Sequence, residues 1–332
     1  MAFCRRNCSA TAQVQPPARA LGAITVVAVL TGLFSGGVAA GASSGPARLL
    51  TGSRAETAAP PNVLSASTQV AHTPDGAVGY REIGAGSPLL LIMGYAGSMD
   101  NWPPDFIDEL AESHLVVMFD NAGVGKTSRL PGMLTIDAMA DQTSVLLTAL
   151  HLRRVAVLGW SMGGMTAQAL AVLHPSQVSA LVLAATQLGN GKALPVPAAA
   201  AAELASPDPR VLLSALFPRG QAAAARAYAL GILQYPNFYT APPGVLLAQS
   251  NAVTQWIEGK DAAGRAASEI RVPTLVADGA VDALDPSRNA ALLTAAIKGA
   301  RAHLYPDAGH AFLFQDYTEF ISALNSFLGQ VG

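Results

Sequence analysis

From about residue 68 onward, short apolar runs alternate with longer amphipathic stretches. Residues are apolar at nearly every position in 89–94, 115–120, 155–160, 180–185 and 274–279, and more weakly in 302–309. Helical spacing of apolar residues marks 103–112, 134–150, 162–173, 286–298 and 315–328. Strands that are apolar on every position are buried on both faces of a sheet. The pattern therefore predicts an α/β fold with a mostly parallel central sheet flanked by helices.

Two segments depart from this alternation. Residues 68–84 predict a β-hairpin around a Pro-Asp-Gly turn, which precedes the first apolar run. Residues 187–270 are rich in Ala and Pro, carry helical patterns at 198–205, 210–217, 220–234 and 244–262, and offer no strand. Such a stretch is too long for a plain connection, so we expect a helical cap inserted after the sixth strand.

The N-terminal region has the pattern of an export signal. Arg5, Arg6 and Arg19 precede an apolar segment at 21–40, whose small residues Val38 and Ala40 would place cleavage after Ala40. About twenty apolar residues also suffice to span a bilayer, so a membrane tether through residues 21–40 is the alternative. Either reading predicts an exported protein, which is secreted, held in the cell envelope or anchored in the membrane.

These segments divide the chain into five parts. We expect a signal peptide or signal-anchor at 1–40, a linker at 41–65, a first core part at 66–186, the cap at 187–270 and a second core part at 271–332.

Composition narrows the function classes. Of the 332 residues 51% are hydrophobic, and 20 basic residues stand against 22 acidic ones, for a net charge of −2. This balance gives no reason to expect a nucleic-acid partner. The two cysteines, Cys4 and Cys8, both precede the apolar segment, so no disulfide framework, zinc-cysteine site or cysteine nucleophile is expected after it. We expect no cofactor, no metal and a small, mostly neutral ligand.

Gly159-Trp160-Ser161-Met162-Gly163 lies between the apolar run 155–160 and the helical pattern 162–173. A serine at a tight strand-to-helix turn needs small residues two positions before and after it, because side chains there would collide with the adjoining elements. Such a turn exposes the hydroxyl beside free N–H groups at a helix N-terminus. The motif therefore predicts a nucleophilic serine at Ser161.

With this motif, residues 68–332 resemble the α/β-hydrolase fold superfamily, in which nucleophile, acid and histidine follow in that chain order. The resemblance implies His310, in the sequence Asp307-Ala308-Gly309-His310, as general base. It implies Asp282, three residues after Gly279, as the acid that orients the imidazole.

Two other carboxylates compete with Asp282 for the role of acid. Asp278 lies where the run 274–279 ends, and Asp285 precedes Pro286 and suits an N-cap for the following helix. Asp278 and Asp285 therefore stay open as alternatives.

The resemblance also implies an oxyanion hole made by the backbone N–H groups of Tyr95 and Met162. Many relatives carry His-Gly before the first of these residues, whereas this chain has Met93-Gly94. Methionine in place of histidine removes a side-chain hydrogen bond, so the sequence does not show what holds the loop that contains Tyr95 rigid.

One motif suggests a phosphate-binding loop and is rejected. Gly123-Val124-Gly125-Lys126-Thr127 ends like a Walker A motif, but Asp120 stands where that motif needs its first glycine. The segment instead resembles the turn after a central strand of α/β-hydrolases.

These observations predict a serine hydrolase that cleaves small or medium, mostly apolar carboxylic esters through an acyl-enzyme. The same fold also allows a lactonase, a carbon-carbon hydrolase, a cofactor-free perhydrolase or a catalytically silent ligand-binding protein. The cap aromatics Phe217, Tyr235, Phe238, Tyr239 and Trp256 suggest an apolar pocket or the cap's own packing. The sequence does not fix the substrate or the oligomeric state.

Overall fold

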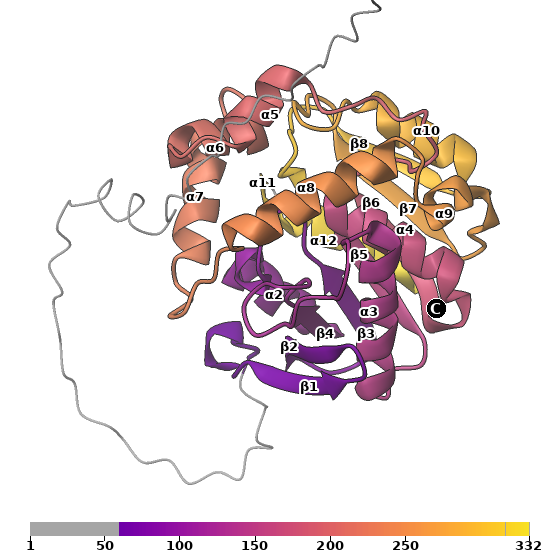
Figure 1. The fold of residues 1–332 in the computed structure, drawn as a ribbon. Coiled ribbons are helices and arrows are strands. Elements are labelled where there is room, and N and C mark those ends of the chain that lie inside the picture. The colour runs from indigo at the N-terminus through magenta and orange to yellow at the C-terminus, as the bar shows by residue number, and fades with distance from the viewer. Residues whose placement is uncertain (1–59, 316, 332) are drawn as a thin grey trace, which may run out of the picture.

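The computed structural model describes residues 60–315 and 317–331, so the whole predicted export segment and the predicted linker up to residue 59 lie outside the described residues. The described part forms one eight-stranded sheet with helices on both faces (Figure 1). The strands are β1 Gln69–Thr73, β2 Gly76–Ile83, β3 Ser87–Ile92, β4 His114–Phe119, β5 Val155–Trp160, β6 Val178–Ala184, β7 Thr274–Gly279 and β8 Arg301–Tyr305.

The α-helices are α2 Pro104–Ala111, α3 Ile136–Ala149, α4 Met162–Leu173, α5 Ala198–Leu204, α6 Pro209–Leu216, α7 Ala222–Ile232, α8 Pro243–Ile257, α9 Ala262–Arg265, α10 Arg288–Ala296, α11 Phe312–Gln315 and α12 Tyr317–Gly329. Short 3-10 turns are η2 Val63–Ser65, η3 Met99–Asn101, η4 Pro175–Gln177 and η5 Ala267–Glu269. None of the helices in the described ranges is long and apolar enough to cross a membrane.

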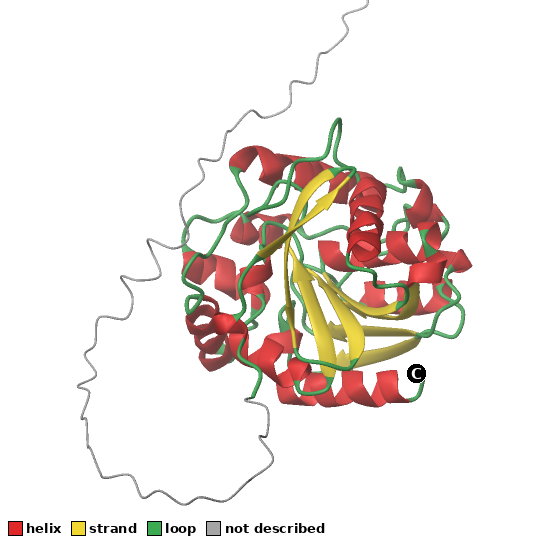
Figure 2. Cartoon of the chain, turned by 90° about the horizontal axis from the view of Figure 1, so that it is seen from below, coloured by secondary structure: helices red, strands yellow, loops and turns green. Residues whose placement is uncertain are grey.

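The strand order is β1-β2-β4-β3-β5-β6-β7-β8, and every pair from β4 onward is parallel. Only the N-terminal hairpin β1–β2 and its junction with β4 are antiparallel among the described strands. Figure 2 shows this twisted sheet enclosed by helices. The predicted α/β class with a mostly parallel sheet is therefore confirmed.

Side chains of the central strands alternate between two cores, as the two-residue period of a strand requires. Leu89 and Leu91 of β3 face the layer that contains α2 and α12, whereas Leu90 and Ile92 face the layer that contains α3 and α4. All four side chains are fully buried, which explains why the sequence shows an unbroken apolar run at this strand.

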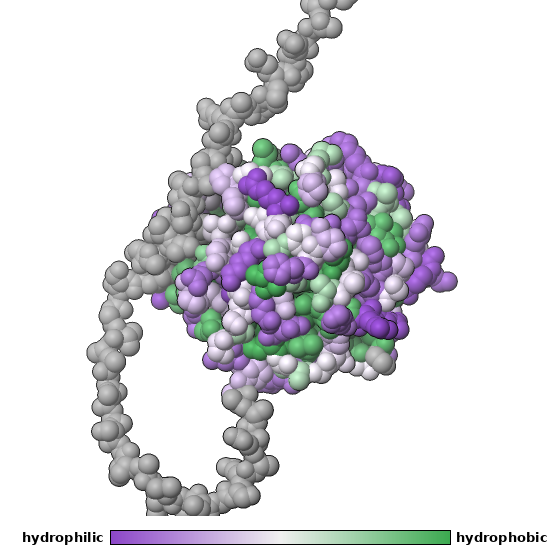
Figure 3. All heavy atoms as spheres, turned by 60° about the horizontal axis from the view of Figure 1, so that its bottom comes forward, coloured by the Kyte–Doolittle hydropathy of each residue, from purple (hydrophilic) through white to green (hydrophobic). Residues whose placement is uncertain are grey.

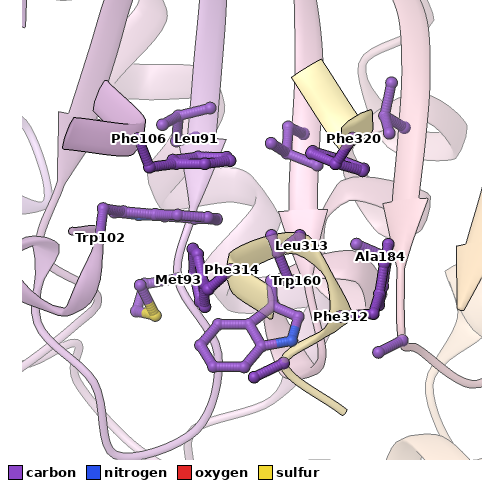
Figure 4. Close-up of a cluster of buried hydrophobic side chains, with 14 of the residues drawn as sticks. Leu91, Met93, Trp102, Phe106, Trp160, Ala184, Phe312, Leu313, Phe314 and Phe320 are labelled. Atoms are coloured by element: carbon purple, nitrogen blue, oxygen red, sulfur yellow. The ribbon is translucent and has the colours of Figure 1, made fainter. Parts of the chain in front are cut away.

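An aromatic cluster in the first layer fixes two segments of the carboxyl edge relative to each other (Figure 4). Phe314 of α11 meets Trp102, Phe106 and Trp160 edge-on, with ring centroids 5.1 to 5.7 Å apart. Aromatic pairs prefer this geometry and contribute beyond the area they bury. The end of β5 and the segment after β8 are thereby packed against one another.

The cap lies between β6 and β7 and consists of α5 to α8, followed by α9. In Figure 1, α5, α6 and α7 gather at one side and α8 runs back across the molecule towards α9. The predicted helical cap after the sixth strand is confirmed, while the exact domain boundaries stay a prediction. At the end of the predicted linker, Val63 is buried and its N–H donates to Asp108 Oδ1 over 2.7 Å, so this part packs on α2.

Polar and apolar residues are interspersed on the face that Figure 3 shows. Large hydrophobic side chains that are exposed, such as Met133 and Leu247, come from elements far apart in the sequence. Scattered exposed hydrophobic residues are normal on soluble proteins and indicate no binding face by themselves.

Candidate active site

Four loops that carry the predicted site residues leave the sheet at the same edge. Tyr95 follows β3, Ser161 follows β5, Asp282 follows β7 and His310 follows β8. Since these strands are parallel and lie in the order β3-β5-β6-β7-β8, their carboxyl ends line one side of the molecule. Open α/β sheets bind ligands in that position.

Ser161 has backbone angles φ 57° and ψ −122°, a conformation that non-glycine residues rarely adopt. Its N–H donates to the Ala184 carbonyl over 2.9 Å, and its carbonyl accepts from Thr186 Oγ1 over 2.7 Å. The surrounding structure thus holds a strained turn in place, as is typical of functional residues.

The two glycines of the motif are required by close backbone approach. A Cβ on Gly163 would lie 2.0 Å from the Ile92 carbonyl oxygen, and one on Gly159 would lie 2.4 Å from the Gly163 carbonyl oxygen. Both distances are far shorter than a van der Waals contact. The need for small residues at these positions follows from β3, β5 and α4 meeting at this turn.

His310 and Asp282 form a buried pair. His310 Nδ1 lies 2.7 Å from Asp282 Oδ2, and the side chains are 6% and 0% exposed. The other carboxylate oxygen, Oδ1, accepts the N–H groups of Leu284 and Asp285 over 2.7 and 2.8 Å. These bonds fix the carboxylate, which in turn orients the imidazole.

The environment raises the pKa of His310. Burial by itself lowers it, but the charge of Asp282 and the hydrogen bond that the imidazole donates to Asp282 outweigh burial. The pair therefore stabilises a protonated imidazole, which a general base becomes during the reaction.

The competing acids occupy different positions. Asp278 Oδ1 accepts the N–H of Gly279 over 2.7 Å, and Asp285 Oδ1 accepts from Asn289 Nδ2 over 2.6 Å. Among the described residues, neither makes a hydrogen bond to His310. The expectation that Asp285 is the N-cap of α10 is wrong, because Ser287 precedes this helix and Asp285 lies too far from the helix start.

Burial raises the pKa of both Asp278 and Asp285, and the charge of Asp282 raises each further. Side-chain hydrogen bonding with Asp282 raises the pKa of Asp278 further, whereas hydrogen bonds from Asn289 and Gln187 lower that of Asp285 without offsetting burial. A buried carboxyl group beside a charged carboxylate favours its neutral form. The site thus contains one carboxylate hydrogen-bonded to histidine and two that favour protonation.

A hydrogen bond joins the serine turn to the histidine loop. Trp160 Nε1 donates to the His310 carbonyl oxygen over 2.9 Å, and the two rings lie 5.6 Å apart at a tilt. Within the described residues, the Ser161 hydroxyl makes no hydrogen bond to the His310 ring. Such contacts are often long in free enzymes and tighten when substrate binds.

The loop after β3 runs against the serine turn. A Cβ on Gly94 would lie 3.1 Å from the Ser161 Cβ, so the backbone of this loop passes beside the serine. The N–H groups of Tyr95 and Met162 donate no hydrogen bond within residues 60–315 and 317–331. The two N–H groups thus lack an acceptor in the described structure, as the predicted oxyanion hole requires.

Two side chains that sequence reasoning missed hold this loop. Asn121 Nδ2 donates to the Met93 carbonyl over 2.9 Å, and Gln249 Oε1 of α8 accepts the N–H of Ala96 over 2.9 Å. Asn121 lies two residues after the end of β4 at the same sheet edge, where polar residues of a site are expected, so the sequence could have indicated it. No sequence signal marks Gln249, because it lies 153 residues from its partner inside an unassigned cap.

The cap also covers the histidine loop. The Ala311 N–H donates to the Leu216 carbonyl over 3.0 Å, and a Cβ on Gly309 would lie 2.9 Å from the same oxygen. Of the cap aromatics, Tyr235 and Trp256 are buried and donate to the carbonyls of Trp102 and Gln187. These two residues serve packing between cap and core.

The glycine-rich turn after β4 packs around the carboxylate of Asp120. Asp120 Oδ1 accepts the N–H of Met99 over 2.8 Å, and a Cβ on Gly125 would lie 2.1 Å from Oδ2. Burial raises the pKa of Asp120 to about 6. An acidic group at the centre of the turn makes it unsuited to bind phosphate. In the described ranges, no three His, Cys, Asp or Glu side chains are grouped to hold a metal ion.

Comparison with known proteins gives consistent matches. A family model described as "alpha/beta hydrolase fold" matches residues 87–317. The protein named "Putative carbamate hydrolase RutD" from Azorhizobium caulinodans is 30% identical over 275 residues, which cover 79% of this chain and 98% of that protein.

Solved structures agree in fold. An alpha/beta hydrolase fold protein from Chitinophaga pinensis superposes with a TM-score of 0.72 at 25% identity, covering 80% of this chain and 98% of that one. The esterase RhEst1 from Rhodococcus sp. ECU1013 superposes with a TM-score of 0.64 at 21% identity, covering 80% and 100%.

Proposed function

The chain belongs to the alpha/beta hydrolase fold family, and from this we propose that it is a serine hydrolase of small or medium, mostly apolar carboxylic esters. The observation that carries the proposal is the buried His310–Asp282 pair, joined over 2.7 Å and connected through Trp160 to the strained turn of Ser161. Acyl transfer needs a nucleophile, a base and an orienting acid in this relationship.

In the proposed reaction, Ser161 Oγ attacks the ester carbonyl while the imidazole of His310 takes the hydroxyl proton. The N–H groups of Tyr95 and Met162 stabilise the oxyanion that forms. His310 then returns the proton to the leaving alkoxide, which departs as alcohol and leaves an acyl group on Ser161. A water molecule then attacks the acyl carbonyl while His310 takes its proton. The bond to Ser161 Oγ breaks, the acid leaves and His310 returns the proton to Oγ, while Asp282 holds the imidazole through both steps.

A fluorophosphonate probe tests the nucleophile. We expect the probe to label the wild type but not Ser161→Ala, and p-nitrophenyl acetate turnover to fall by about 10³-fold or more in the variant. Ser128→Ala is a matched control, since the Ser128 hydroxyl accepts the N–H of Ala77 at the start of β2, whereas in the described structure it bonds to none of the proposed site residues. Equal labelling of wild type and Ser161→Ala contradicts the assignment. Tight ligand binding without turnover would favour a catalytically silent binding protein.

Carbamates are a second candidate substrate class. The Azorhizobium caulinodans relative, whose name includes carbamate hydrolysis, aligns over nearly its whole length. Esters and carbamates share the carbonyl carbon and the leaving group that the proposed chemistry needs. Comparing kcat/KM for p-nitrophenyl acetate and a p-nitrophenyl carbamate separates the two, and an acyl-chain-length series of esters then defines the pocket.

We also propose that the protein is exported through residues 1–40. The support is the sequence pattern alone: basic residues, then an apolar segment, then small residues before Gly41. Cell fractionation with N-terminal sequencing tests it. A secreted or envelope form that begins at Gly41 indicates a cleaved signal, a full-length form in the membrane fraction indicates a tether, and a full-length form in the cytoplasm contradicts export.

A further inference from the structure

The loop that would supply the first oxyanion donor lies between two fixed points. We name residues 94–97 the oxyanion loop. On one side, Asn121 Nδ2 holds the Met93 carbonyl, which belongs to the Met93–Gly94 peptide unit. On the other side, Gln249 Oε1 holds the Ala96 N–H, which belongs to the Tyr95–Ala96 peptide unit. The unit between them, Gly94–Tyr95, carries the free N–H.

This loop needs such support because its backbone is strained. Ala96 has φ 65°, in the left-handed region that residues other than glycine seldom occupy. The side chain before the loop is Met93, which cannot serve as a strong hydrogen-bond donor. A strained segment persists only where its surroundings hold it, and Gln249 is the contact that comes from the cap.

Packing alone does not explain a glutamine at this position. On α8, the buried residues are Val245, Gln249, Ala252 and Trp256, which share one helix face. Gln249 is fully buried, and its Nε2 has no acceptor in the described structure. An apolar side chain of similar length would avoid the cost of burying an unpartnered donor. The hydrogen bond from Ala96 is the contact that requires the amide.

We propose that Gln249 is a positioning residue that sets the orientation of the Tyr95 N–H through the Ala96 N–H, so that the cap completes the oxyanion hole. This inference rests on the proposed function. It makes the cap a part of the catalytic apparatus and not only a wall of the pocket.

Three variants test the role. Gln249→Met keeps the length of the side chain but removes the acceptor, and Gln249→Glu keeps an acceptor oxygen. Gln255→Met makes the same change on the same helix, at a half-buried residue whose amide bonds to the Asn251 carbonyl and not to the oxyanion loop. Turnover of p-nitrophenyl acetate, thermal unfolding and fluorophosphonate labelling are measured for each.

In Gln249→Met we expect kcat to fall by about 10- to 100-fold, which is below the loss caused by removing an oxyanion donor outright. KM should change by less than about threefold and the melting temperature by only a few degrees, since the donor acts in the transition state. Gln255→Met should match the wild type in all three measurements.

Gln249→Glu gives a readout that a packing role would not move. Burial raises the pKa of a glutamate, so at pH 6 its neutral acid can accept the Ala96 N–H as the amide does. At pH 6, the kcat of Gln249→Glu relative to the wild type should exceed the relative kcat of Gln249→Met. The relative kcat of Gln249→Glu should fall as pH rises, because an ionised carboxylate beside the oxyanion hole repels the oxyanion.

The outcomes separate this inference from the proposed function. If the kcat of Gln249→Met stays within about twofold of the wild type, the positioning role is wrong. If Ser161→Ala is inactive in the same assay, the proposed serine hydrolase activity still stands. Equal losses in Gln249→Met and Gln249→Glu at pH 6 also overturn the role, because they point to packing. If Ser161→Ala retains wild-type turnover, the proposed function itself fails.

Discussion

The indole N–H of Trp160 donates a 2.9 Å hydrogen bond to the backbone carbonyl of His310, 150 residues further along the chain. Trp160 directly precedes Ser161, and the His310 carbonyl belongs to the residue that carries the imidazole. This bond therefore connects the turn of the proposed nucleophile to the loop of the proposed base. The aromatic cluster around Phe314 surrounds the indole and fixes its orientation.

Replacing Trp160 by Phe should reduce kcat by about tenfold, because the spacing between nucleophile and base is no longer fixed and small misplacements are costly. The lost bond should also lower the free energy of unfolding by about 1 kcal/mol. Trp102→Phe is the matched control, since the Trp102 indole N–H is buried without a partner in the described structure. If both variants reduce kcat equally, packing and not the hydrogen bond is responsible.

Asp282→Asn should lower kcat by about 10³- to 10⁴-fold, because an amide cannot stabilise the imidazolium or hold the required tautomer. Asp285→Asn should stay within about threefold of the wild type, since burial already favours the neutral form of Asp285 and asparagine has nearly its shape. Steady-state kinetics of both variants decide between the two carboxylates. The reverse result would make Asp285 the acid.

The pH dependence of kcat/KM should show an ascending limb that reports deprotonation of His310. The net effect of its surroundings raises the pKa of His310, so the limb should lie above the ordinary histidine value of about 6.5. In Asp282→Asn the carboxylate that raises the pKa of His310 is absent. Burial then lowers this pKa, and the ascending limb should move to lower pH. A limb that stays in place would exclude Asp282 as the cause of the shift.

Asp278 should destabilise the fold as pH rises. Burial raises its pKa in the folded state above the value of about 3.9 in the unfolded chain. Between these two values the folded state binds more protons than the unfolded state, so the free energy of unfolding decreases with increasing pH. Asp278→Asn should therefore unfold at a higher temperature than the wild type at pH 8, and the difference should shrink at pH 4. A constant difference across pH would contradict this account.

Gly163→Ala should prevent correct folding or cost about 3 kcal/mol or more, because its Cβ would lie 2.0 Å from the Ile92 carbonyl oxygen. Gly329→Ala, where nothing lies within 4 Å of the added Cβ, should change stability by less than about 1 kcal/mol. Chemical denaturation of both variants measures the contrast. A stable, active Gly163→Ala would show that β3 and α4 can separate at the turn.

The order of strands and helices could be predicted because a parallel sheet buries both faces of its strands. Leu89 to Ile92 face two different cores, and so the run is apolar without alternation. The glycines around Ser161 could be predicted as well. A Cβ added at either position would lie 2.0 to 2.4 Å from a backbone carbonyl oxygen, so only glycine fits there. The resemblance to α/β-hydrolases also indicated His310 and Asp282 as partners.

Contacts between distant segments could not be predicted in this way. The sequence around Asp285 suggests a helix cap, whereas the fold buries this residue beside Asp282 and Asn289. Gln249 has no local signal, because one glutamine in a helical pattern looks like any other until the helix is placed over the oxyanion loop.

The α/β class, the cap after the sixth strand and the strand-to-helix turn at Ser161 follow from the amino-acid sequence, because each depends on local periodicity or on residue size at a turn. Which carboxylate bonds to His310, which two favour protonation and which side chains hold the loop after β3 follow from the folded arrangement alone. Those properties depend on burial and on distances of 2.7 to 2.9 Å between residues far apart in the chain, and such distances exist only once the sheet has brought its carboxyl ends together.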